Sequence, residues 1–306
     1  MRSGSIVLPT VILCVVVSSA RLTAQTSDPG SGGPESATDE SENPQHPTDD
    51  RPYWRTNLFG RFFRDQKYLV TTWWPQEFRR PAFMASALAG VALAADSETS
   101  LDGGIDRQFE QSVLGASSGD ANRPWRRLSS LGNAPTGALL IGVGYLVGRL
   151  SHQDRLAEAS SLSAEALLSS GLYCTVLKAL SARTRPASGG RGDFFEYQPQ
   201  SGQVNGSFPS GHATGAFTVA TVFAGVYSDR RWVPWIAYGT AGLVGASRVA
   251  LGRHFPSDVL MGAVLGHSVG RMVVQRQRDA EDTAFRIEPY IDFGGQSAGV
   301  VWSRRW

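Results

Sequence analysis

A histidine and an aspartate lie four residues apart in the segment from Ser247 to Asp258, which reads SRVALGRHFPSD. Pro256 favours the first turn of a helix, so the Asp258 carboxylate can hold one imidazole nitrogen of His254 and fix its tautomer. The other ring nitrogen is then free to attack, and Arg248 supplies a cation for an anionic group. A His–Asp metal pair is the alternative, but it needs further ligands at suitable spacing, and the sequence shows none. These residues predict nucleophilic attack on an anionic substrate.

Two more cations precede a proline in the segment 178–186, KALSARTRP. Lys178 and Arg185 are about two helical turns apart, so both can point from one helix face before Pro186 ends the helix. Two fixed cations at a helix end form a cradle for a multivalent anion such as phosphate, although such pairs are more often a solvated face. Arg183 is expected to face elsewhere.

The tetrapeptide PSGH, at positions 209–212, is followed by an apolar helical run. Ser210 occupies the position of a helix N-cap, and Gly211 allows the backbone to approach a ligand closely. A helix N-terminus offers free N–H groups and the positive end of a dipole to phosphate. His212 would then lie at the rim of an anion site, where it can donate a proton to a leaving oxygen. The plain alternative is a capped helix with a surface histidine.

In chain order the three segments read K-x6-RP, PSGH and SR-x5-H-x3-D. They resemble the signature motifs of the type 2 phosphatidic acid phosphatase (PAP2) superfamily. That superfamily includes lipid phosphate phosphatases, bacterial class A acid phosphatases and vanadium haloperoxidases. The match covers roughly residues 136–275, with no departure at a motif position. The resemblance implies an α-helical bundle with the three motifs gathered at one end.

The resemblance also implies a role for each motif residue. His254 would be the nucleophile that forms a phosphohistidine, Asp258 would orient it, and His212 would be the general acid. The phosphoryl oxygens would be held by Lys178, Arg185, Arg248, Ser210 and the Gly211 amide. Phosphatases of this superfamily need no metal or other cofactor, so none is expected here. Vanadate would be the cofactor only if the chain were a haloperoxidase.

The N-terminal region indicates export. Residues 1–24 have the form of a secretory signal, with Arg2, an apolar core and small residues before a cleavage position. An uncleaved membrane anchor is the alternative. Residues 25–52 are a linker rich in Ser, Pro, Gly and acidic residues, which is expected to be disordered. The formal net charge of +2 is too small to indicate binding to nucleic acid.

The remaining chain divides into three predicted parts. Residues 53–135 would hold N-terminal amphipathic and apolar helices and an irregular loop, 96–133, without a motif. Aromatic and basic residues alternate over 51–81, which suits either a membrane interface or an ordinary helix packed on the domain. Residues 136–278 would form the catalytic helical domain, and residues 284–306 a short β-hairpin.

We therefore expect an all-α fold, a PAP2-type bundle of about six core helices, with a disordered tail and a short hairpin at its ends. The helices are predicted at 82–95, 136–150, 160–181, 213–228, 232–251 and 257–274. Gly262, Gly266 and Gly270 form a stripe that lets two helix backbones approach closely. The segments are borderline for spanning a bilayer, so a buried bundle and modest membrane helices both stay open.

The leading functional hypothesis is a metal-independent phosphatase of the cell envelope. Its substrate would be a lipid phosphate monoester or pyrophosphate, of the phosphatidic acid or prenyl pyrophosphate type. We expect an exported, membrane-associated protein whose active site faces the periplasm or exterior, with no particular oligomeric state indicated. The alternatives are a soluble periplasmic acid phosphatase of broad specificity, a vanadate-dependent haloperoxidase and a non-catalytic anion-binding scaffold.

Overall fold

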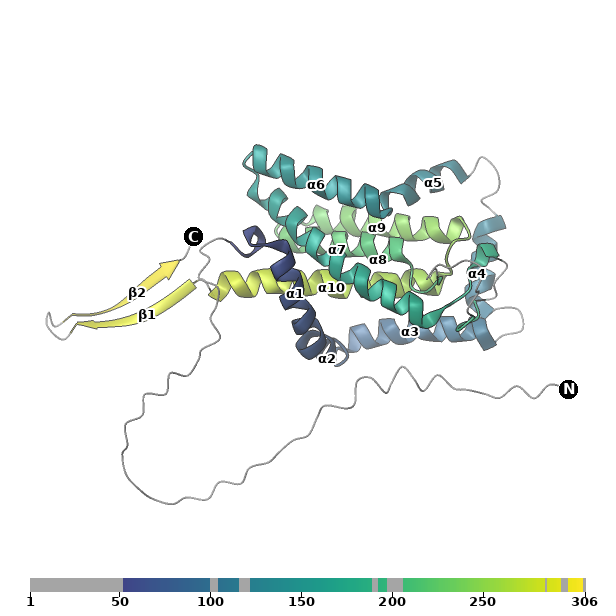
Figure 1. The fold of residues 1–306 in the computed structure, drawn as a ribbon, viewed down its shortest axis with the longest axis horizontal. Coiled ribbons are helices and arrows are strands. Elements are labelled where there is room, and N and C mark those ends of the chain that lie inside the picture. The colour runs from purple at the N-terminus through teal and green to yellow at the C-terminus, as the bar shows by residue number, and fades with distance from the viewer. Residues whose placement is uncertain are drawn as a thin grey trace, which may run out of the picture. The chain divides into compact units, whose positions relative to one another are not determined.

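The computed structural model describes residues 52–99, 104–115, 122–188, 192–196, 206–283, 285–292 and 297–304. The predicted signal, residues 1–24, and nearly all of the predicted linker, residues 25–52, lie outside them. The described part is an all-α bundle with a two-stranded hairpin at its C-terminal end, as expected (Figure 1).

All six apolar segments form helices, and the prediction of about six core helices is confirmed. They are α3 (Pro81–Thr99), α6 (Ala134–Leu150), α7 (Asp154–Ser181), α8 (Gly211–Val226), α9 (Trp232–Ala250) and α10 (Pro256–Thr283). Helix α8 packs against α7, α9 and α10, while α3 covers another side of α10 and α6 covers α7 (Figure 1). The helix that follows the PSGH motif is thus surrounded by the helices that carry the other two motifs.

The glycine stripe of α10 lies against α8 and allows the close approach that its spacing predicts. A Cβ atom would lie 2.6 Å from the Ser210 carbonyl oxygen if placed at Gly262, and 2.8 Å from the Thr218 carbonyl oxygen if placed at Gly270. At Gly266 it would overlap a backbone carbonyl oxygen of α8. The two backbones are therefore closer than any larger residue permits.

We expect Gly266→Ala to destabilise the bundle, because the added methyl group meets the Thr214 carbonyl rather than a flexible side chain. Overpacking of this kind costs about 1–3 kcal/mol. The measurement is the free energy of unfolding from chemical denaturation. Gly242→Ala on α9 is the matched control, since a Cβ there meets nothing within 4 Å. Equal stabilities of the two variants would contradict this account of the stripe.

The segment 96–133 is not the irregular loop that we expected. It contains α4 (Gly104–Gly115) and α5 (Asn122–Leu131), which pack on α3 and α9 respectively. The Asp96 carboxylate accepts a hydrogen bond of 2.7 Å from the Ile105 amide at the start of α4. Both helices are short and rich in polar residues, so they lack the long apolar runs that reveal the core helices.

The aromatic and basic segment near the N-terminus folds as short helices packed on the bundle. They are η2 (Tyr53–Arg55), α1 (Leu58–Tyr68), the π-helical turn η3 (Leu69–Trp73) and α2 (Trp74–Glu77). Helix α1 turns a charged side chain inward: Arg61 is fully buried and pairs at 2.6 Å with Glu165 of α7, which is also fully buried. Its Phe59 and Phe63 are 65% and 69% exposed. The helix is packed on the domain and still presents aromatic rings outward.

The predicted C-terminal hairpin is confirmed. Strands β1 (Phe285–Asp292) and β2 (Ser297–Arg304) are antiparallel, with Phe285 opposite Arg304 and Asp292 opposite Ser297.

Among the described residues, no single helix has both the length and the apolar character needed to cross a bilayer. One bent pair, α5 with α6, meets that criterion when its two helices, at 54° to each other, are taken together.

Candidate active site

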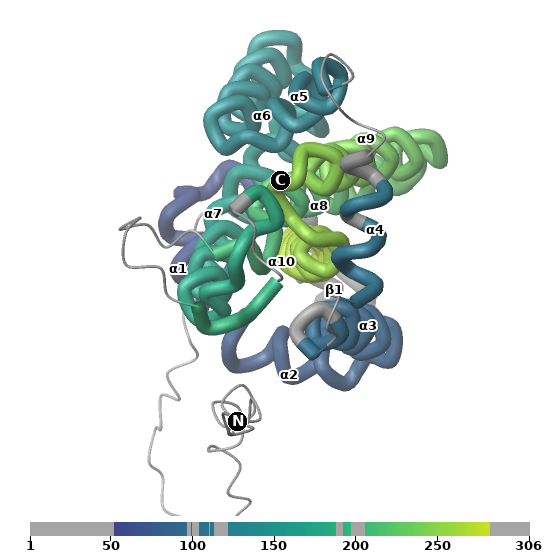
Figure 2. Tube along the Cα trace, turned by 90° about the vertical axis from the view of Figure 1, so that its right-hand side faces the viewer, coloured from purple at the N-terminus to yellow at the C-terminus, as the bar shows by residue number. Residues whose placement is uncertain are grey.

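The predicted site residues come together where four core helices end or begin. Lys178 is in the last turn of α7, Ser210 caps α8, Arg248 is in the last turn of α9 and Asp258 is in the first turn of α10. His254 lies in the short connection between α9 and α10. Figure 2 faces this end of the bundle and shows α4 beside α9 and α10, which it contacts.

His254 is buried against Asp258, with 3.5 Å between its Nδ1 atom and the Asp258 Oδ2 atom. The same oxygen accepts hydrogen bonds from the Phe255 amide, at 2.9 Å, and from the Ser207 hydroxyl. The Ser207 Oγ atom is also 3.4 Å from Nδ1. Because Nδ1 is turned toward this carboxylate, Nε2 on the other side of the ring is directed away from it.

The electrostatic setting fixes the protonation states of His254 and Asp258. Burial lowers the pKa of His254 to about 4 despite the opposing effect of Asp258, and the charges of Lys178 and Arg185 add to the lowering. Burial alone would raise the pKa of Asp258, but Arg183 and the His254 and Ser207 hydrogen bonds hold it well below its ordinary value. At neutral pH the pair is therefore a neutral imidazole beside an ionised carboxylate.

Lys178 and Arg185 both reach the site, although not from one helix face as expected. Helix α7 ends at Ser181 because Ala182 adopts a left-handed conformation with φ 42°, so Arg185 lies in the segment that follows. The Lys178 Nζ atom donates to the Gly206 carbonyl at 2.8 Å, just before the PSGH segment. Burial lowers the pKa of Lys178 to about 8, and the charges of Arg185 and Arg248 contribute to this shift.

Arg248 has unused hydrogen-bonding capacity at this end of the bundle. One of its terminal nitrogens donates to the Ser129 hydroxyl of α5. Its Nε atom is buried and has no hydrogen-bond partner among the residues that the structure describes. A buried, unpaired guanidinium N–H is costly unless a ligand accepts from it, and an oxyanion is the acceptor that suits it best.

His212 lies at the start of α8, where Ser210 forms the predicted N-cap by accepting from the Ala213 amide. The His212 Nε2 atom is 2.7 Å from the Asn133 Oδ1 atom, which precedes α6. Burial lowers the pKa of His212 to about 3, and the nearby charges of Arg248, His254, Lys178 and Arg185 add to the effect. Because Arg248, Lys178 and Arg185 lie close to His212, an anion that they bind would lie next to His212.

Sequence reasoning missed several residues around the site, and one was assigned the wrong direction. Arg183, expected to face elsewhere, is buried and bonded to Asp258 at 2.6 Å. Asp106, Ser129 and Asn133 come from a segment in which no motif was recognised. For Arg183, its position between Lys178 and Arg185 in the K-x6-RP segment was the one sequence feature that could have indicated a place near the site.

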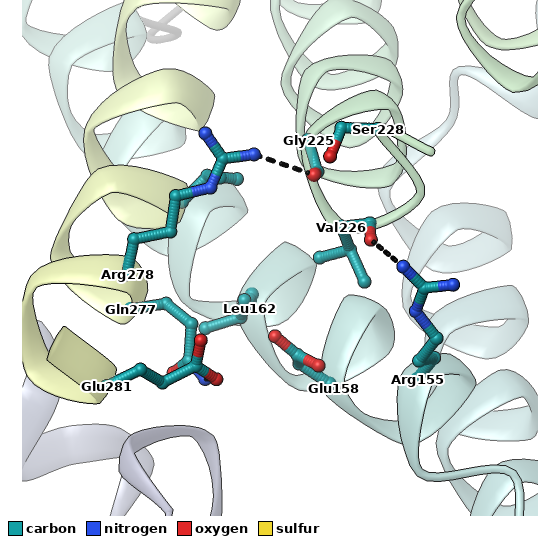
Figure 3. A pocket seen from close by; sticks show the side chains of 10 residues that line it. Arg155, Glu158, Leu162, Gly225, Val226, Ser228, Gln277, Arg278 and Glu281 are labelled. Atoms are coloured by element: carbon teal, nitrogen blue, oxygen red, sulfur yellow. Dashed lines mark hydrogen bonds between the residues drawn. The ribbon is translucent and has the colours of Figure 1, made fainter. Parts of the chain in front are cut away.

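A separate pocket of about 220 Å³ lies between α7, α8 and α10 (Figure 3). The pocket adjoins the C-terminal end of α8, and His212 lies at the N-terminal end of the same helix. At the rise of an α-helix these two ends are about 20 Å apart, so the pocket is distant from His212. Glu158 and Glu281 line it, and burial followed by the charge of Glu281 raises the pKa of Glu158 to about 7. None of the motif residues lines this pocket.

The converging helix ends of this bundle carry a His–Asp pair, a second histidine and three cations, and this set of side chains suits a phosphate-like anion. The comparison with known families agrees with this class. Residues 161–282 match the model of the PAP2 superfamily.

The curated relatives are lipid A 1-phosphatases. The chain is 39% identical over 84 residues to that of Porphyromonas gingivalis, which is 27% of this chain and 19% of the relative. It is 41% identical over 100 residues to that of Rhizobium etli, which is 32% of this chain and 41% of the relative. The chain thus spans less than half the length of these two proteins.

Two solved structures are similar to this chain. One is a transmembrane PAP2 type phosphatidylglycerolphosphate phosphatase from Bacillus subtilis, 24% identical, with a TM-score of 0.49 over 64% of this chain and 96% of that one. The other is LpxE from Aquifex aeolicus, 21% identical, with a TM-score of 0.42 over 55% of this chain and 93% of that one.

Proposed function

We propose that this protein is a phosphatase that hydrolyses a lipid phosphate monoester or pyrophosphate through a phosphohistidine. The observation that carries the proposal is the buried His254, 3.5 Å from Asp258, at the end of the bundle where α7 and α9 bring Lys178 and Arg248 and where Arg185 also acts. A neutral imidazole next to a cluster of cations can bind a phosphate group and attack its phosphorus atom.

In the first step His254 Nε2 forms a bond to phosphorus, and the bond from phosphorus to the leaving oxygen breaks. Asp258 keeps the other side of the ring oriented and stabilises the cationic phosphoimidazole. The charge spread over the phosphoryl oxygens is balanced by the three cations, with Ser210 and the Gly211 amide at the N-terminus of α8. A Cβ placed at Gly211 would lie 3.9 Å from the Lys178 Cε atom, so the Lys178 side chain lies beside the N-terminus of α8.

His212 supplies the proton that the leaving oxygen takes up. Without an anion its low pKa makes it neutral, because burial disfavours the charged imidazole and the surrounding cations repel a further proton. A bound phosphate dianion reverses the local charge and raises that pKa, so the acid is formed when substrate is present. In the second step the neutral His212 takes a proton from water, which attacks phosphorus and releases His254.

The substrate that we propose carries its phosphate on a lipid. The relatives named as lipid A 1-phosphatases support a phosphorylated glycolipid, with phosphatidic acid and prenyl pyrophosphates as related candidates. Exposed apolar side chains support association with lipid. They include Phe59 and Phe63 on α1, Leu139, Leu140, Val143 and Leu146 on α6, and Trp235, Ile236 and Leu243 on α9. We propose an exported, membrane-associated protein with its site facing the periplasm or exterior.

The test measures phosphate release by washed membranes and by the soluble fraction of cells expressing the chain, with EDTA present. The substrates are lipid A, phosphatidic acid, a prenyl pyrophosphate and p-nitrophenyl phosphate, and membranes with the His254→Ala variant are the control. We expect activity in membranes with preference for a lipid. Activity restricted to the soluble fraction and p-nitrophenyl phosphate would reject the lipid substrate. Activity only with vanadate, halide and peroxide would reject hydrolysis.

A further inference from the structure

Arg183 is the centre of a buried network behind the His254–Asp258 pair. Its side chain is fully buried, and one terminal nitrogen donates to the Asp258 Oδ1 atom at 2.6 Å and to the Ser257 hydroxyl at 2.7 Å. The other terminal nitrogen donates to the Asp106 Oδ2 atom at 3.0 Å. The guanidinium therefore bridges the carboxylate that orients the nucleophile and a second carboxylate from α4.

Asp106 fixes the start of α10 as well as Arg183. Its Oδ1 atom accepts from the Ser257 amide at 2.9 Å, and its Oδ2 atom accepts from the Ser257 hydroxyl. Ser257 directly precedes Asp258, so one carboxylate holds both the backbone and the guanidinium that surround Asp258. Asp106 is 1% exposed and lies outside the region that matches the family model.

The position of Arg183 is fixed on its remaining sides. The Phe255 and Phe194 rings lie 4.5 and 4.9 Å from its guanidinium carbon, and its Nε atom donates to the Gly192 carbonyl at 2.9 Å. Its own carbonyl accepts from the Ser207 amide at 2.8 Å, and the Ser207 hydroxyl donates to Asp258. A planar guanidinium held in this way leaves the Asp258 carboxylate one orientation.

We propose that Arg183 and Asp106 are positioning residues for the nucleophile, acting through Asp258. Arg183 holds the carboxylate that orients His254, and Asp106 neutralises Arg183 so that Asp258 keeps enough negative charge to act on the imidazole. The proposal rests on the proposed function, because it assigns these two residues to the same reaction. Neither residue touches the substrate.

Removal of Arg183 and removal of Asp106 should shift the pKa of His254 in opposite directions. Without the positive charge of Arg183, the negative charge of Asp258 acts on the imidazole unopposed and raises the pKa of His254. Without the negative charge of Asp106, Arg183 pairs with Asp258 alone, and the pKa of His254 falls. The titratable and charged groups that act on His254 are Asp258 from α10, Lys178 from α7, His212 from α8 and Arg185, and the backbone carbonyl of Arg248 on α9 accepts from its amide. All five are unchanged in both variants.

The experiment compares Arg183→Gln with Asp106→Asn. The pKa of His254 is followed by NMR of protein labelled in its five histidines, with the His254 signal assigned from the His254→Ala variant. We expect a rise of about 1 pH unit for Arg183→Gln and a fall of about 0.5 unit for Asp106→Asn. For Arg183→Gln, kcat/KM at pH 7 should fall about 100-fold, because a small displacement of a reacting group costs that much.

Arg61 and Glu165 provide matched controls. They form another fully buried arginine–carboxylate pair, and Glu165 lies about 20 Å along α7 from Lys178 at the rise of a helix. Arg61→Gln and Glu165→Gln should lower stability by a similar amount and leave both kcat/KM and the pKa of His254 unchanged. Arg183→Lys, which keeps the charge but not the planar fork, should lose activity with an almost unshifted pKa.

Unshifted values, or shifts in the same direction, would overturn the inference and leave Arg183 and Asp106 as structural residues. If Arg183→Gln does not fold, the pKa of His254 in Asp106→Asn tests the inference alone. This substitution keeps the shape of the side chain, and an unshifted or raised pKa would overturn the inference. The NMR titration needs no turnover, so failure of the inference is separable from failure of the proposed function. A folded wild-type protein that releases phosphate from no substrate would reject the proposed function whatever the shifts.

Discussion

Replacement of His254 by alanine should abolish phosphate release. Loss of a nucleophile that acts together with an orienting carboxylate costs at least about 10,000-fold in kcat. The fold should persist, since the change removes a side chain from a loop between α9 and α10 and leaves the helix packing intact. Lys178, Arg185 and Arg248 stay in place, so affinity for inorganic phosphate should change little. Initial rates and phosphate binding by calorimetry measure the two quantities separately.

His267→Ala is the control for this substitution. His267 is also a histidine of the described bundle, but it lies on α10 and is hydrogen-bonded to the Tyr238 hydroxyl at 3.0 Å. It should retain nearly full activity. Substantial hydrolysis by His254→Ala, with the control behaving normally, would mean that another group attacks phosphorus.

Replacement of His212 by alanine should give the second largest loss, and its size should depend on the leaving group. General acid catalysis contributes about 100- to 10,000-fold for a leaving oxygen that needs a proton, such as that of a lipid alcohol or sugar. p-Nitrophenolate leaves without one, so the first step should be largely spared with p-nitrophenyl phosphate. The second step still lacks its base, and a phosphorylated enzyme should accumulate.

The accumulated intermediate can be identified directly. Quenching His212→Ala after mixing with a radiolabelled phosphate ester should trap label on the protein, in a form stable to alkali and labile to acid. The wild-type protein should show much less, because it hydrolyses the intermediate. An equal loss of rate with both leaving groups, and no trapped label, would remove His212 from the role of general acid.

The core helices could be predicted because their apolar runs are long and carry small residues at helical spacing. The glycines of α10 are an example: their spacing predicts the close contact with α8, and the contact depends only on backbone geometry. Helices α4 and α5 escaped prediction since they are short and rich in polar residues, and their formation depends on packing against α3 and α9.

The reacting groups could also be proposed from the sequence, whereas their surroundings could not. Type and spacing indicate His254, Asp258 and His212. The bend after α7 depends on Ala182 in a left-handed conformation. A non-glycine residue rarely adopts this conformation, and no local sequence pattern predicts it here. That bend directs Arg183 inward, and its partner Asp106 is distant in the chain, so only the three-dimensional structure joins them.

Three side chains that precede the family region each contact a group of the candidate site. Asp106 binds Arg183, Ser129 binds Arg248, and Asn133 binds His212. The groups that would bind and transform the phosphate thus belong to one part of the chain, while part of what fixes their rotamers belongs to another. We therefore expect substitutions in α4 and around α5 to change the rate or the pH optimum of the proposed reaction while every motif residue stays the same.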